Sequence, residues 1–591
     1  MISPVGGSGQ EGTTPVTAAP PPPRGAPDSA GSLSIPPFDN LPDMLTSTAR
    51  EHHAATAFTA VLPNGMNGRI SYADTDRAAD AFAAYLREEL GLSPGDRVAV
   101  QLPNCLAYPV VAFGALKAGC VLVNTNPLYT TPELRRQYAD AEVAAVVVAD
   151  LFADRLAPAL PDLGHPPVVL APVTSFFPRY VAGIVRTVQR VWDRTLPPVR
   201  FPATRLGDAL RRGVHLLAAG GTDRYWRDLG PADPAALQYT GGTTGVSKGA
   251  VLTHGSLLAN CEQMMAVTGD LIRPGRETVL TALPLYHVFA FTVNLLGFHR
   301  RGAHNVLVPN PRPLTNLKRA LENHPVTWIT GVNTLFDGLC REQWFVDHPP
   351  PALRAAVAGG MALHGSVAQR WEQVTGVPVV EGYGLTEASP VLTFNPLDDR
   401  ARPGTVGIPV PGTQLRCVDD SGATVPAGEP GELCARGPQV MAGYWRRPEE
   451  TAAVLRGGEL RTGDVAIVDR DGYVRLVDRT KDLVLVSGFN VYPTEVEEVL
   501  TAHPGIREAA VVGVPDAASG ERVRAVVVRT DPALTAEQVR AWAVQRLTGY
   551  KVPREVTFAD DLPKSPIGKI LRKDVRAAQA DAPVPVPRTG G

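Results

Sequence analysis

The sequence predicts an α/β protein with a large amino-terminal part and a smaller α+β domain near the carboxyl end. The chain has 591 residues, 44% of them hydrophobic, which is too long for one core and apolar enough for two or three. Strand-like and helix-like segments alternate in the first part, as is typical of parallel α/β layers. Near Asp478 the pattern changes to short strands and helices, which indicates a separate small domain.

The two ends of the chain differ in composition from the rest. Residues 1–40 are largely Pro, Gly, Ala and Ser, including four consecutive prolines at 20–23. Such a segment buries too little apolar surface to offset the entropy of ordering, so we expect a disordered tail. Residues 576–591 are again rich in Ala, Pro and Gly and are expected to be flexible.

Regular elements follow one another in the first part of the chain. The apolar runs predict strands at 96–102, 120–123 and 142–148. Helical spacing predicts helices at 108–118 and 131–141, the second with Glu133 near its start. Strands and helices in this alternation predict a parallel sheet covered by helices.

The small domain shows a different order of elements. Its predicted elements are strands at 483–486, 509–514 and 523–529 and helices at 493–501 and 535–548. Pro493 suits the first turn of one helix, and Thr535 with Gln538 forms a capping box for the other. The mixture predicts an α+β fold of about one hundred residues.

Composition excludes several classes of protein. The net charge of -2 gives no global electrostatic case for a nucleic-acid partner. The six cysteines show no metal-type or redox-type spacing, so we expect buried free thiols in a reducing compartment. No apolar run reaches the roughly 18 to 20 residues of a membrane span, and residues 1–40 lack signal-peptide features, so neither a span nor export is expected.

Residues 239–248, Tyr-Thr-Gly-Gly-Thr-Thr-Gly-Val-Ser-Lys, form the most informative segment. Its glycines let backbone N–H groups approach an anion, its threonines add hydroxyl groups, and its lysine adds positive charge. These residues are Thr240, Gly241, Gly242, Thr243, Thr244, Gly245 and Lys248. The pattern predicts a triphosphate cradle, although its spacing differs from the Walker motif of kinase-type P-loops. A flexible surface loop is the alternative that this segment alone leaves open.

Three other segments carry residues suited to nucleotide chemistry. Residues 381–387 combine an aromatic ring, a hydroxyl and a carboxylate, which can stack on a base, touch a phosphate and hold a divalent cation. Asp464 follows a glycine turn and could accept both hydroxyls of a ribose. Lys569 follows a Pro/Gly-rich turn and could neutralise a carboxylate and a phosphate as they react. Taken singly, the first two are also compatible with ordinary turns and the third with a solvated lysine.

In this order and spacing, the segments resemble the adenylate-forming (AMP-binding) superfamily of acyl-CoA synthetases, adenylation domains and luciferases, from about Leu41 to Asp574. Residues 284–287, 329–335, 486–493 and 547–553 resemble bacterial long-chain fatty-acid CoA ligases in particular. The resemblance implies a large multi-subdomain adenylate-forming domain and a small mobile domain that rotates about a hinge. We place these at residues 41–478, 483–575 and 479–482 respectively.

The implied activity is ATP-dependent ligation of a long- or medium-chain fatty acid to coenzyme A through an acyl-adenylate, releasing AMP and pyrophosphate. A carboxylate attacks a polyanion poorly, so Mg²⁺ and Lys569 would have to screen charge and align the reactants. A fatty acyl-AMP ligase that loads a carrier protein is the alternative. Its relatives usually carry an insertion that blocks CoA, and none is evident between Asp464 and Lys569. A catalytically idle binding protein is disfavoured because Lys248, Glu387, Asp464 and Lys569 occur together.

The resemblance also implies roles for individual residues. Lys248, Thr386, Glu387 and Lys569 would be catalytic, and Thr240 and Glu387 would ligate Mg²⁺. The phosphates would lie on Thr240, Gly241, Gly242, Thr243, Thr244 and Gly245. Adenine would lie on Gly360, Met361 and Tyr383, the ribose on Asp464 and Arg479, and CoA near Gly488.

The acyl site and the hinge are implied in the same way. His287, Phe289 and Phe291 would shape the mouth of an acyl tunnel, and Gly331, Val332 and Asn333 part of its wall. A hydrogen-bonded core histidine is the alternative for His287. No carboxylate that could pair with a substrate ammonium lies at 286–288, so an amino-acid substrate is disfavoured. Lys481 would be the hinge residue, with an ordinary surface lysine as the alternative.

Residues 176–196 carry apolar side chains at helical spacing, with Arg186, Arg190 and Arg194 on the opposite side of the helical wheel. Such a helix could lie on an anionic bilayer and collect fatty acid there. A helix docked on the large domain, with a solvated basic face, is the commoner arrangement. We therefore expect a cytoplasmic protein, leave open a peripheral contact with the inner face of the membrane, and regard a homodimer as compatible with the sequence.

Overall fold

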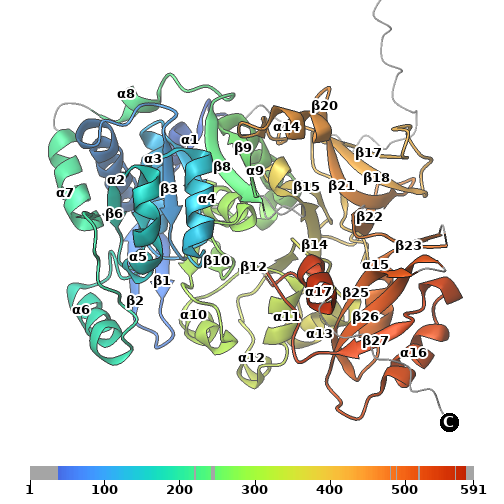
Figure 1. Ribbon diagram of the computed structural model, residues 1–591. Helices are drawn as coiled ribbons and strands as arrows, with labels where there is room; N and C mark the ends of the chain where they lie inside the picture. The colour runs from blue at the N-terminus through green and yellow to red at the C-terminus, as the bar shows by residue number, and fades with distance from the viewer. Residues whose placement is uncertain are drawn as a thin grey trace, which may run out of the picture.

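The computed structural model describes residues 37–217, 221–240, 247–479, 481–487, 489–516, 519–565 and 568–580. Four sheets organise these residues: two large ones flanked by helices, a smaller five-stranded one, and a second five-stranded one in the carboxyl-terminal domain. In Figure 1 the two large sheets occupy the blue to yellow-green part, and the carboxyl-terminal domain is the red part beside it. The α/β class and the small α+β domain are therefore confirmed.

The first large sheet has the strand order β19-β9-β8-β4-β3-β5-β6-β7. Its strands are β3 (Arg97–Gln101), β4 (Val121–Asn124), β5 (Val143–Val148), β6 (Val168–Leu170), β7 (Thr204–Arg205), β8 (Pro234–Thr240), β9 (Lys248–Thr253) and β19 (Gly443–Tyr444). The six strands from β3 to β8 are parallel, while β8, β9 and β19 pair antiparallel. Helices α3 (Ala107–Lys117) and α4 (Thr131–Ala141) confirm the predicted alternation, and Glu133 completes a capping box with Thr130.

The second large sheet has the order β16-β15-β14-β13-β12-β10-β11-β1-β2. Its strands are β1 (Thr56–Val61), β2 (Asn67–Ser71), β10 (Thr278–Thr281), β11 (His304–Leu307), β12 (Trp328–Gly331), β13 (Ala355–Ala358), β14 (Val379–Gly384), β15 (Val391–Phe394) and β16 (Ile408–Pro409). Strands β10 to β14 run parallel, so their carboxyl ends meet at one edge, where ligands of α/β sheets usually bind.

Helices cover both large sheets. The principal ones are α1 (Leu41–Glu51), α2 (Tyr72–Ala84), α7 (Leu206–Leu217), α9 (His254–Thr268), α11 (Asn333–Leu339), α13 (Gly365–Thr375), α14 (Pro448–Val454) and the π-helix η6 (Ala290–Phe298). The third sheet contains β17 (Gln414–Val418), β18 (Pro430–Arg436), β20 (Leu455–Arg456), β21 (Glu459–Val468) and β22 (Val474–Arg479). Strand β22 leads directly into the carboxyl-terminal domain.

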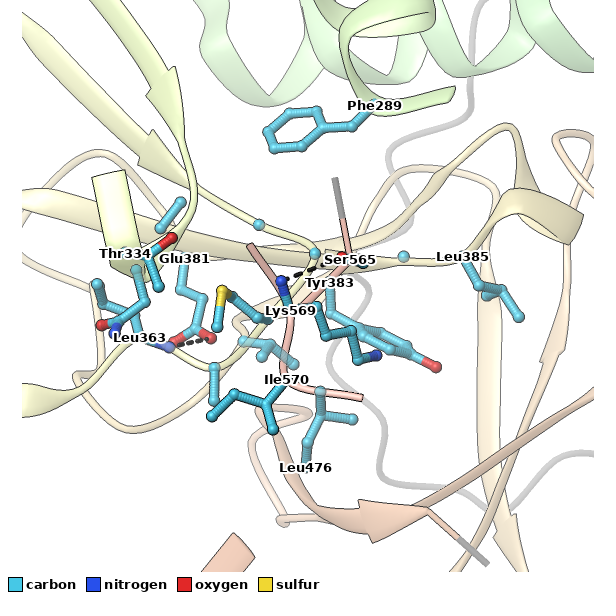
Figure 2. Close-up of a pocket in the computed structure, with 18 of the residues that line it drawn as sticks. Phe289, Thr334, Leu363, Glu381, Tyr383, Leu385, Leu476, Ser565, Lys569 and Ile570 are labelled. Atoms are coloured by element: carbon cyan, nitrogen blue, oxygen red, sulfur yellow. Dashed lines mark hydrogen bonds between the residues drawn. The ribbon is translucent and has the colours of Figure 1, made fainter. Parts of the chain in front are cut away.

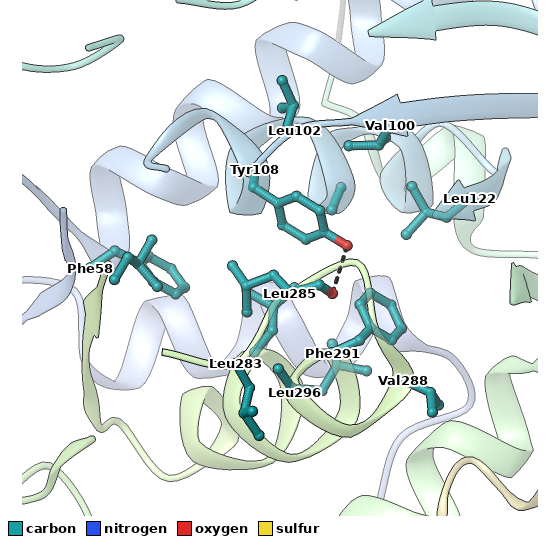
Figure 3. Packing of buried hydrophobic residues seen from close by; sticks show 14 of the residues in the cluster. Phe58, Val100, Leu102, Tyr108, Leu122, Leu283, Leu285, Val288, Phe291 and Leu296 are labelled. Carbon is teal, nitrogen blue, oxygen red and sulfur yellow. Dashed lines mark hydrogen bonds between the residues drawn. The ribbon is translucent and has the colours of Figure 1, made fainter. Parts of the chain in front are cut away.

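The main core lies between the first sheet and helix η6 (Figure 3). Tyr108 of α3 is fully buried there, and its hydroxyl donates to Asn124 Oδ1 at 2.7 Å and lies 2.9 Å from the carbonyl oxygen of Leu285. Phe291 packs in the same core with no exposed surface. Burying one such aromatic side chain stabilises the fold by about 1.5 to 3 kcal/mol. This packing therefore holds helix η6 against the first sheet.

The carboxyl-terminal domain contains the five predicted elements in order and three that were not predicted, namely β24 (Phe489–Val491), β27 (Glu555–Phe558) and α17 (Arg572–Ala580). The predicted elements are β23 (Val484–Val486), α15 (Pro493–Thr501), β25 (Ile506–Asp516), β26 (Gly520–Arg529) and α16 (Ala536–Val544). The capping box of Thr535 and Gln538 is present, but α16 ends at Val544 rather than Thr548. The chain turns there, which lets Leu547 pack against the domain core.

Two predicted boundaries need correction. Residues 37–40 belong to the folded structure, because Asn40 caps α1 and donates to the carbonyl oxygens of Trp226 and Leu229. Residues 576–580 continue α17, which buries Val575 on its inner face. Residues 1–36 and 581–591 lie outside the described part of the chain.

The segment at 176–196 forms helix α6 (Arg179–Thr187), continued by the π-helical turn η4 (Val188–Trp192). Phe177, Val181 and Val185 are buried, so the helix docks on the large domain as the commoner arrangement predicts. The apolar stripe is only partly covered, since Tyr180 is 73% and Trp192 is 85% exposed. Across the described ranges, no helix is long and apolar enough to cross a membrane.

Candidate active site

A cavity of about 1980 Å³ lies between the large domain and the carboxyl-terminal domain. Its lining includes most of the predicted site residues that the structure describes. These are Thr240, Lys248, His287, Asn333, Gly360, Met361, Tyr383, Thr386, Glu387, Asp464, Arg479, Lys481 and Lys569. Figure 2 shows Phe289, Glu381, Tyr383 and Lys569 around one part of this cavity. Segments more than 300 residues apart in sequence therefore meet where the resemblance requires.

The end of the cavity where the sequence predicts phosphate binding, here called the phosphate-binding end, is built on the hairpin of β8 and β9. Thr240 pairs with Lys248 across it, and the Ser247 hydroxyl donates to the Thr240 carbonyl oxygen at 2.6 Å. The predicted cradle residues Gly241, Gly242, Thr243, Thr244 and Gly245, and the predicted CoA-channel residue Gly488, lie outside the described part of the chain. Thr240 and Lys248, the residues on either side of the predicted cradle, form the last pair of the hairpin.

A carboxylate completes this end of the cavity. Glu387 Oε1 accepts a hydrogen bond from the Tyr444 hydroxyl at 2.7 Å, and Lys248 Nζ lies 5.3 Å from the centre of the Tyr444 ring. A carboxylate and the Thr240 hydroxyl are hard oxygen donors, which suit Mg²⁺. No group of three or more His, Cys, Asp or Glu able to hold an ion was found among the described residues. This donor set fits a Mg²⁺ ion that takes most of its ligands from substrate phosphates and water.

The three residues predicted to bind the nucleoside, Tyr383, Asp464 and Arg479, lie in contact at the cavity wall. The Tyr383 hydroxyl donates to Asp464 Oδ2 at 2.6 Å, and Arg479 Nε lies 3.4 Å from Asp464 Oδ1. Strand pairing sets this geometry, because Asp464 of β21 lies directly opposite Arg479 of β22. Each carboxylate oxygen keeps lone pairs for further donors, such as the hydroxyls of a ribose. The three residues thus form a preassembled polar wall.

A strip of glycine borders this wall. A Cβ at Gly359 would lie 3.1 Å from the Phe289 ring and 3.3 Å from the carbonyl oxygen of Gly382. Gly360 has φ +78°, a left-handed conformation that glycine adopts without strain. Backbone can therefore line the cavity closely here, as a flat base would need.

Lys569 enters the cavity from a short turn of the carboxyl-terminal domain. Ser565 N donates to the Lys569 carbonyl oxygen at 2.7 Å, and Lys569 N donates to Ser565 Oγ at 3.1 Å. Gly568 has φ +87°, and a Cβ there would lie 2.6 Å from Thr334 Oγ1 on α11. The turn thus packs directly on the large domain, and only glycine permits this close approach.

Electrostatics at Lys569 are unusual. Burial, reinforced by the positive charge of Arg479 and opposed by Asp464, lowers the pKa of Lys569 to about 8. Burial and the charge of Lys569 also lower the pKa of His287 to about 4, so this histidine is neutral. Lys569 is therefore a buried lysine whose cationic form an arriving anion would stabilise.

The rate of adenylation is expected to fall as pH rises through about 8. Lys569 is cationic below its pKa and neutral above it, and only the cation can offset the charge of a carboxylate and a phosphate. The measurement is kcat/KM for the acid against pH in wild type and Lys569→Arg, whose side chain stays charged. Burial also raises the pKa of Glu381 to about 8, so Glu381→Gln serves as a second variant. A fall that persists in Lys569→Arg, or that disappears in Glu381→Gln, contradicts the assignment to Lys569.

One part of the cavity lining, here called the apolar arm, consists of apolar side chains, among them Phe289. Its walls come from α9, η6, β12 and β13 and include Met264, Val267, Ile272, Phe289, Val293, Phe298, Trp328 and Val357. Several of these side chains belong to one buried hydrophobic cluster. Such a lining disfavours a charged group against it and favours an alkyl chain.

Three predicted acyl-site residues lie outside the described lining of the cavity. Phe291 lies in the main core and is absent from the described lining of the cavity. It comes two residues after Phe289 on the same helical segment, so its side chain points to a different side of the helix from that of Phe289. Gly331 is also absent from that lining. A Cβ there would meet Leu335 at 2.9 Å and Phe336 at 3.0 Å, so this glycine allows β12 to pack on α11. Val332 is likewise buried outside the described lining.

Two residues of the site escaped the sequence analysis. Glu381 accepts a hydrogen bond from Leu363 N at 3.1 Å, and burial is the main cause of its raised pKa. Glu381 is the first residue of the 381–387 motif. An acidic residue next to the apolar residues of a strand was the sequence feature that could have identified it. Tyr444 contacts Glu387 and Lys248. The residues around it, Gly443-Tyr444-Trp445, belong to none of the motifs that predict the site.

Comparisons with known proteins agree with this geometry. The AMP-binding enzyme family matches residues 45–445, and the AMP-binding enzyme C-terminal domain matches residues 495–569. The chain is 44% identical over 541 residues to a long-chain-fatty-acid–CoA ligase of Escherichia coli O6:H1, covering 91% of this chain and 94% of that protein.

Solved structures show the same fold. ATP-bound MatB from Rhodopseudomonas palustris superposes with a TM-score of 0.77 at 30% identity, covering 92% of this chain and 99% of that one. An anthranilate CoA ligase, AuaEII, in complex with anthranoyl-AMP gives a TM-score of 0.80 at 25% identity, covering 93% and 99%. Family match, sequence identity and fold all cover both domains, and the chain belongs to the AMP-binding enzyme family.

Proposed function

We propose that this protein is an ATP-dependent long-chain fatty-acid CoA ligase, which forms an acyl-adenylate and then transfers the acyl group to CoA. The observation that carries the proposal is that one cavity is lined by the apolar arm, by Lys569 and by the predicted phosphate-binding and ribose-binding residues. The relative from Escherichia coli, named for this activity, supports it over most of both chains. ATP and CoA are the co-substrates, and a carrier protein in place of CoA is not favoured.

In the first step a fatty-acid carboxylate oxygen attacks the α-phosphorus of ATP, and pyrophosphate leaves. We assign Lys569 to hold the carboxylate beside the α-phosphate, because it lines the same cavity as the apolar arm and the proposed nucleotide-binding residues. Lys248 and Thr240 would hold the departing phosphates, and Thr386 would donate to the α-phosphate. Fixed charges of this kind stabilise the transition state because they need no reorganisation.

We assign the nucleoside to Tyr383, Asp464 and Arg479, with Gly360 and Met361 under the base. Mg²⁺, held by Glu387 and Thr240, would neutralise charge on the phosphates when bound. Asp464 is already oriented by Tyr383 and Arg479, so binding a ribose costs little side-chain ordering. Orientation of this kind brings the two reacting groups into line.

In the second step the CoA thiolate attacks the acyl carbon, the mixed anhydride bond to AMP breaks, and a thioester forms. Lys569 lines the cavity in the present arrangement, and we propose that the small domain moves before a thiol approaches. We propose rotation about residues 479–482, with Lys481 as the hinge residue. His287, Phe289 and Asn333 would border the carboxyl end of the acyl chain in both steps.

The experiment that tests this function is an assay of acyl-CoA and AMP formation with acids from C4 to C20 and with aromatic acids, each with and without CoA. Acyl-CoA formation that peaks at long chains supports the proposal. Acyl-AMP that accumulates in the presence of CoA points to transfer onto a carrier protein. Preference for aromatic acids contradicts the assignment of the apolar arm to an alkyl chain.

We also propose that helix α6 with η4 contacts an anionic membrane surface, from which the fatty acid is collected. Residues 179–192 contain three arginines and no acidic residue. Tyr180, Ile184, Val191 and Trp192 are more than half exposed along the same segment. An exposed apolar stripe beside a basic face fits the interface of an anionic bilayer.

Replacing two of these apolar residues is expected to weaken vesicle binding. Ile184→Ser with Trp192→Ser should lower binding to vesicles containing phosphatidylglycerol about tenfold, because both side chains lose apolar burial in the interface. Co-sedimentation measures the fraction of protein bound to the vesicles, and neutral phosphatidylcholine vesicles serve for comparison. Val544→Ser is the matched control, since Val544 is a 61% exposed apolar residue on α16. Equal binding by the double variant and the control contradicts the proposal.

A further inference from the structure

Residues 441–445 form a strap that crosses the strand carrying Lys248 and the turn carrying Glu387. Met441 N donates to the carbonyl oxygen of Glu387 at 2.8 Å, and Trp445 N donates to that of Gly249 at 2.8 Å. Between them, β19 pairs antiparallel with β9, so that Tyr444 lies opposite Ala250. Backbone hydrogen bonds thus join the strap to the strand that carries Lys248 and to the turn that carries Glu387.

The side chain of Tyr444 repeats this link. Its hydroxyl donates to Glu387 Oε1 at 2.7 Å, and its ring lies under Lys248 Nζ at 5.3 Å. The backbone is fixed as well, because Tyr444 N donates to Thr451 Oγ1 at 2.9 Å. Tyr444 also borders the cavity, so both contacts are made at the wall where phosphates would bind.

From these contacts we propose that Tyr444 is a positioning residue for adenylation, which orients the metal-binding carboxylate of Glu387 and the phosphate-binding ammonium of Lys248 together. The inference rests on the proposed function. A carboxylate that accepts a hydrogen bond on one oxygen presents the other in a fixed direction, as outer residues do for metal ligands in general. A ring face under an ammonium restricts where that flexible side chain can reach.

The two contacts have separable consequences. Tyr444→Phe keeps the ring beneath Lys248 and removes only the hydroxyl that orients Glu387. Tyr444→Leu removes both contacts. If Tyr444 positions the two groups, Tyr444→Phe should weaken metal binding alone. Tyr444→Leu should weaken the binding of both the metal and the nucleotide.

A matched control exists on β22 and its flanking turn. Tyr473 donates its hydroxyl to the Arg400 carbonyl oxygen at 2.6 Å, and its ring lies 3.9 Å from the Arg402 guanidinium carbon. It makes the same two kinds of contact without lining the described cavity. Tyr473→Phe therefore reports what the loss of a tyrosine hydroxyl does to the fold alone.

The experiment combines a binding measurement with a kinetic one. Calorimetry gives the Kd of ATP in EDTA, and pyrophosphate exchange with a long-chain fatty acid gives the Mg²⁺ concentration for half-maximal adenylation. For Tyr444→Phe we expect that Mg²⁺ concentration to rise about 3- to 10-fold, with the metal-free Kd of ATP within twofold of wild type. For Tyr444→Leu we expect both quantities to rise, and for Tyr473→Phe neither.

The inference is overturned if Tyr444→Phe leaves the Mg²⁺ requirement unchanged, or if it weakens metal-free ATP binding as much as Tyr444→Leu does. Should Tyr444→Leu fail to fold, Tyr444→Phe still decides the metal half of the proposal. Wild-type acyl-CoA formation is measured first. Failure there removes the proposed function, whereas a normal wild type with an unchanged Tyr444→Phe removes only the role of Tyr444.

Discussion

Lys569→Ala is expected to lose adenylation by a factor of about 10² to 10³ while still converting supplied acyl-adenylate and CoA to acyl-CoA. Lys569 lines the same cavity as the apolar arm and the proposed nucleotide-binding residues, and removing one preorganised charge from a transition state typically costs that much rate. The second step needs no such cation, because the adenylate is already activated. Pyrophosphate exchange measures the first step, and thioester formation from synthetic acyl-adenylate measures the second.

The matched control is Lys564→Ala in the same turn. Lys564 Nζ pairs with Glu508 Oε2 at 2.9 Å and with Asp561, both within the carboxyl-terminal domain. This variant makes the same change of charge and should keep adenylation within a few-fold of wild type. Equal loss of both steps in Lys569→Ala would contradict the role assigned to Lys569.

Lys481→Pro is expected to retain adenylation and to lose thioester formation by a factor of about 10² or more. Proline fixes φ near −65° and removes a backbone donor, so a residue that must change its dihedral angles cannot do so. The present arrangement already places Lys569 in the cavity, and the first step therefore needs no rotation. Single-turnover assays of the two half-reactions measure the effect.

Ion pairs beside the hinge explain why this position matters. Arg572 of α17 pairs with Asp478 Oδ1 at 2.7 Å, Asp482 Oδ2 at 3.3 Å and Glu497 Oε2 at 2.6 Å. Asp478 precedes the proposed hinge residue Lys481, whereas Asp482 and Glu497 follow it. Rotation about Lys481 would separate Arg572 from Asp478 and keep its other two partners. A Lys481→Pro variant that is normal in both steps would remove Lys481 as the hinge residue.

Much of the fold follows from local pattern. The helix at 131–141 and the strand predicted at 142–148 were predictable, because helical spacing with Glu133 near the start and a continuous apolar run each favour one structure. The boundaries at Asn40 and Ala580 were not, because they depend on partners elsewhere in the fold. Asn40 is held by carbonyl oxygens near residue 228, which no local pattern reveals.

The site divides in the same way. Tyr383, Asp464 and Lys569 stood in motifs whose residue types carry the chemistry, and the structure brings all three to one cavity. Phe291 was misassigned because helix η6 presents alternate sides to the cavity and the core, and sequence spacing alone does not say which. Tyr444 acts through its neighbours, so its contact with Glu387 becomes visible only when the chain is folded.

The central claim is that one cavity joins a fatty-acid carboxylate to AMP before CoA reacts. It is tested most directly by following the oxygen of a long-chain fatty acid labelled with ¹⁸O in its carboxyl group. Attack of that oxygen on the α-phosphorus, followed by cleavage of the acyl C–O bond, leaves the label in AMP. The account predicts one ¹⁸O atom in AMP for each acyl-CoA formed from fully labelled acid. Label found in pyrophosphate or phosphate, or unlabelled AMP beside acyl-CoA, would contradict it.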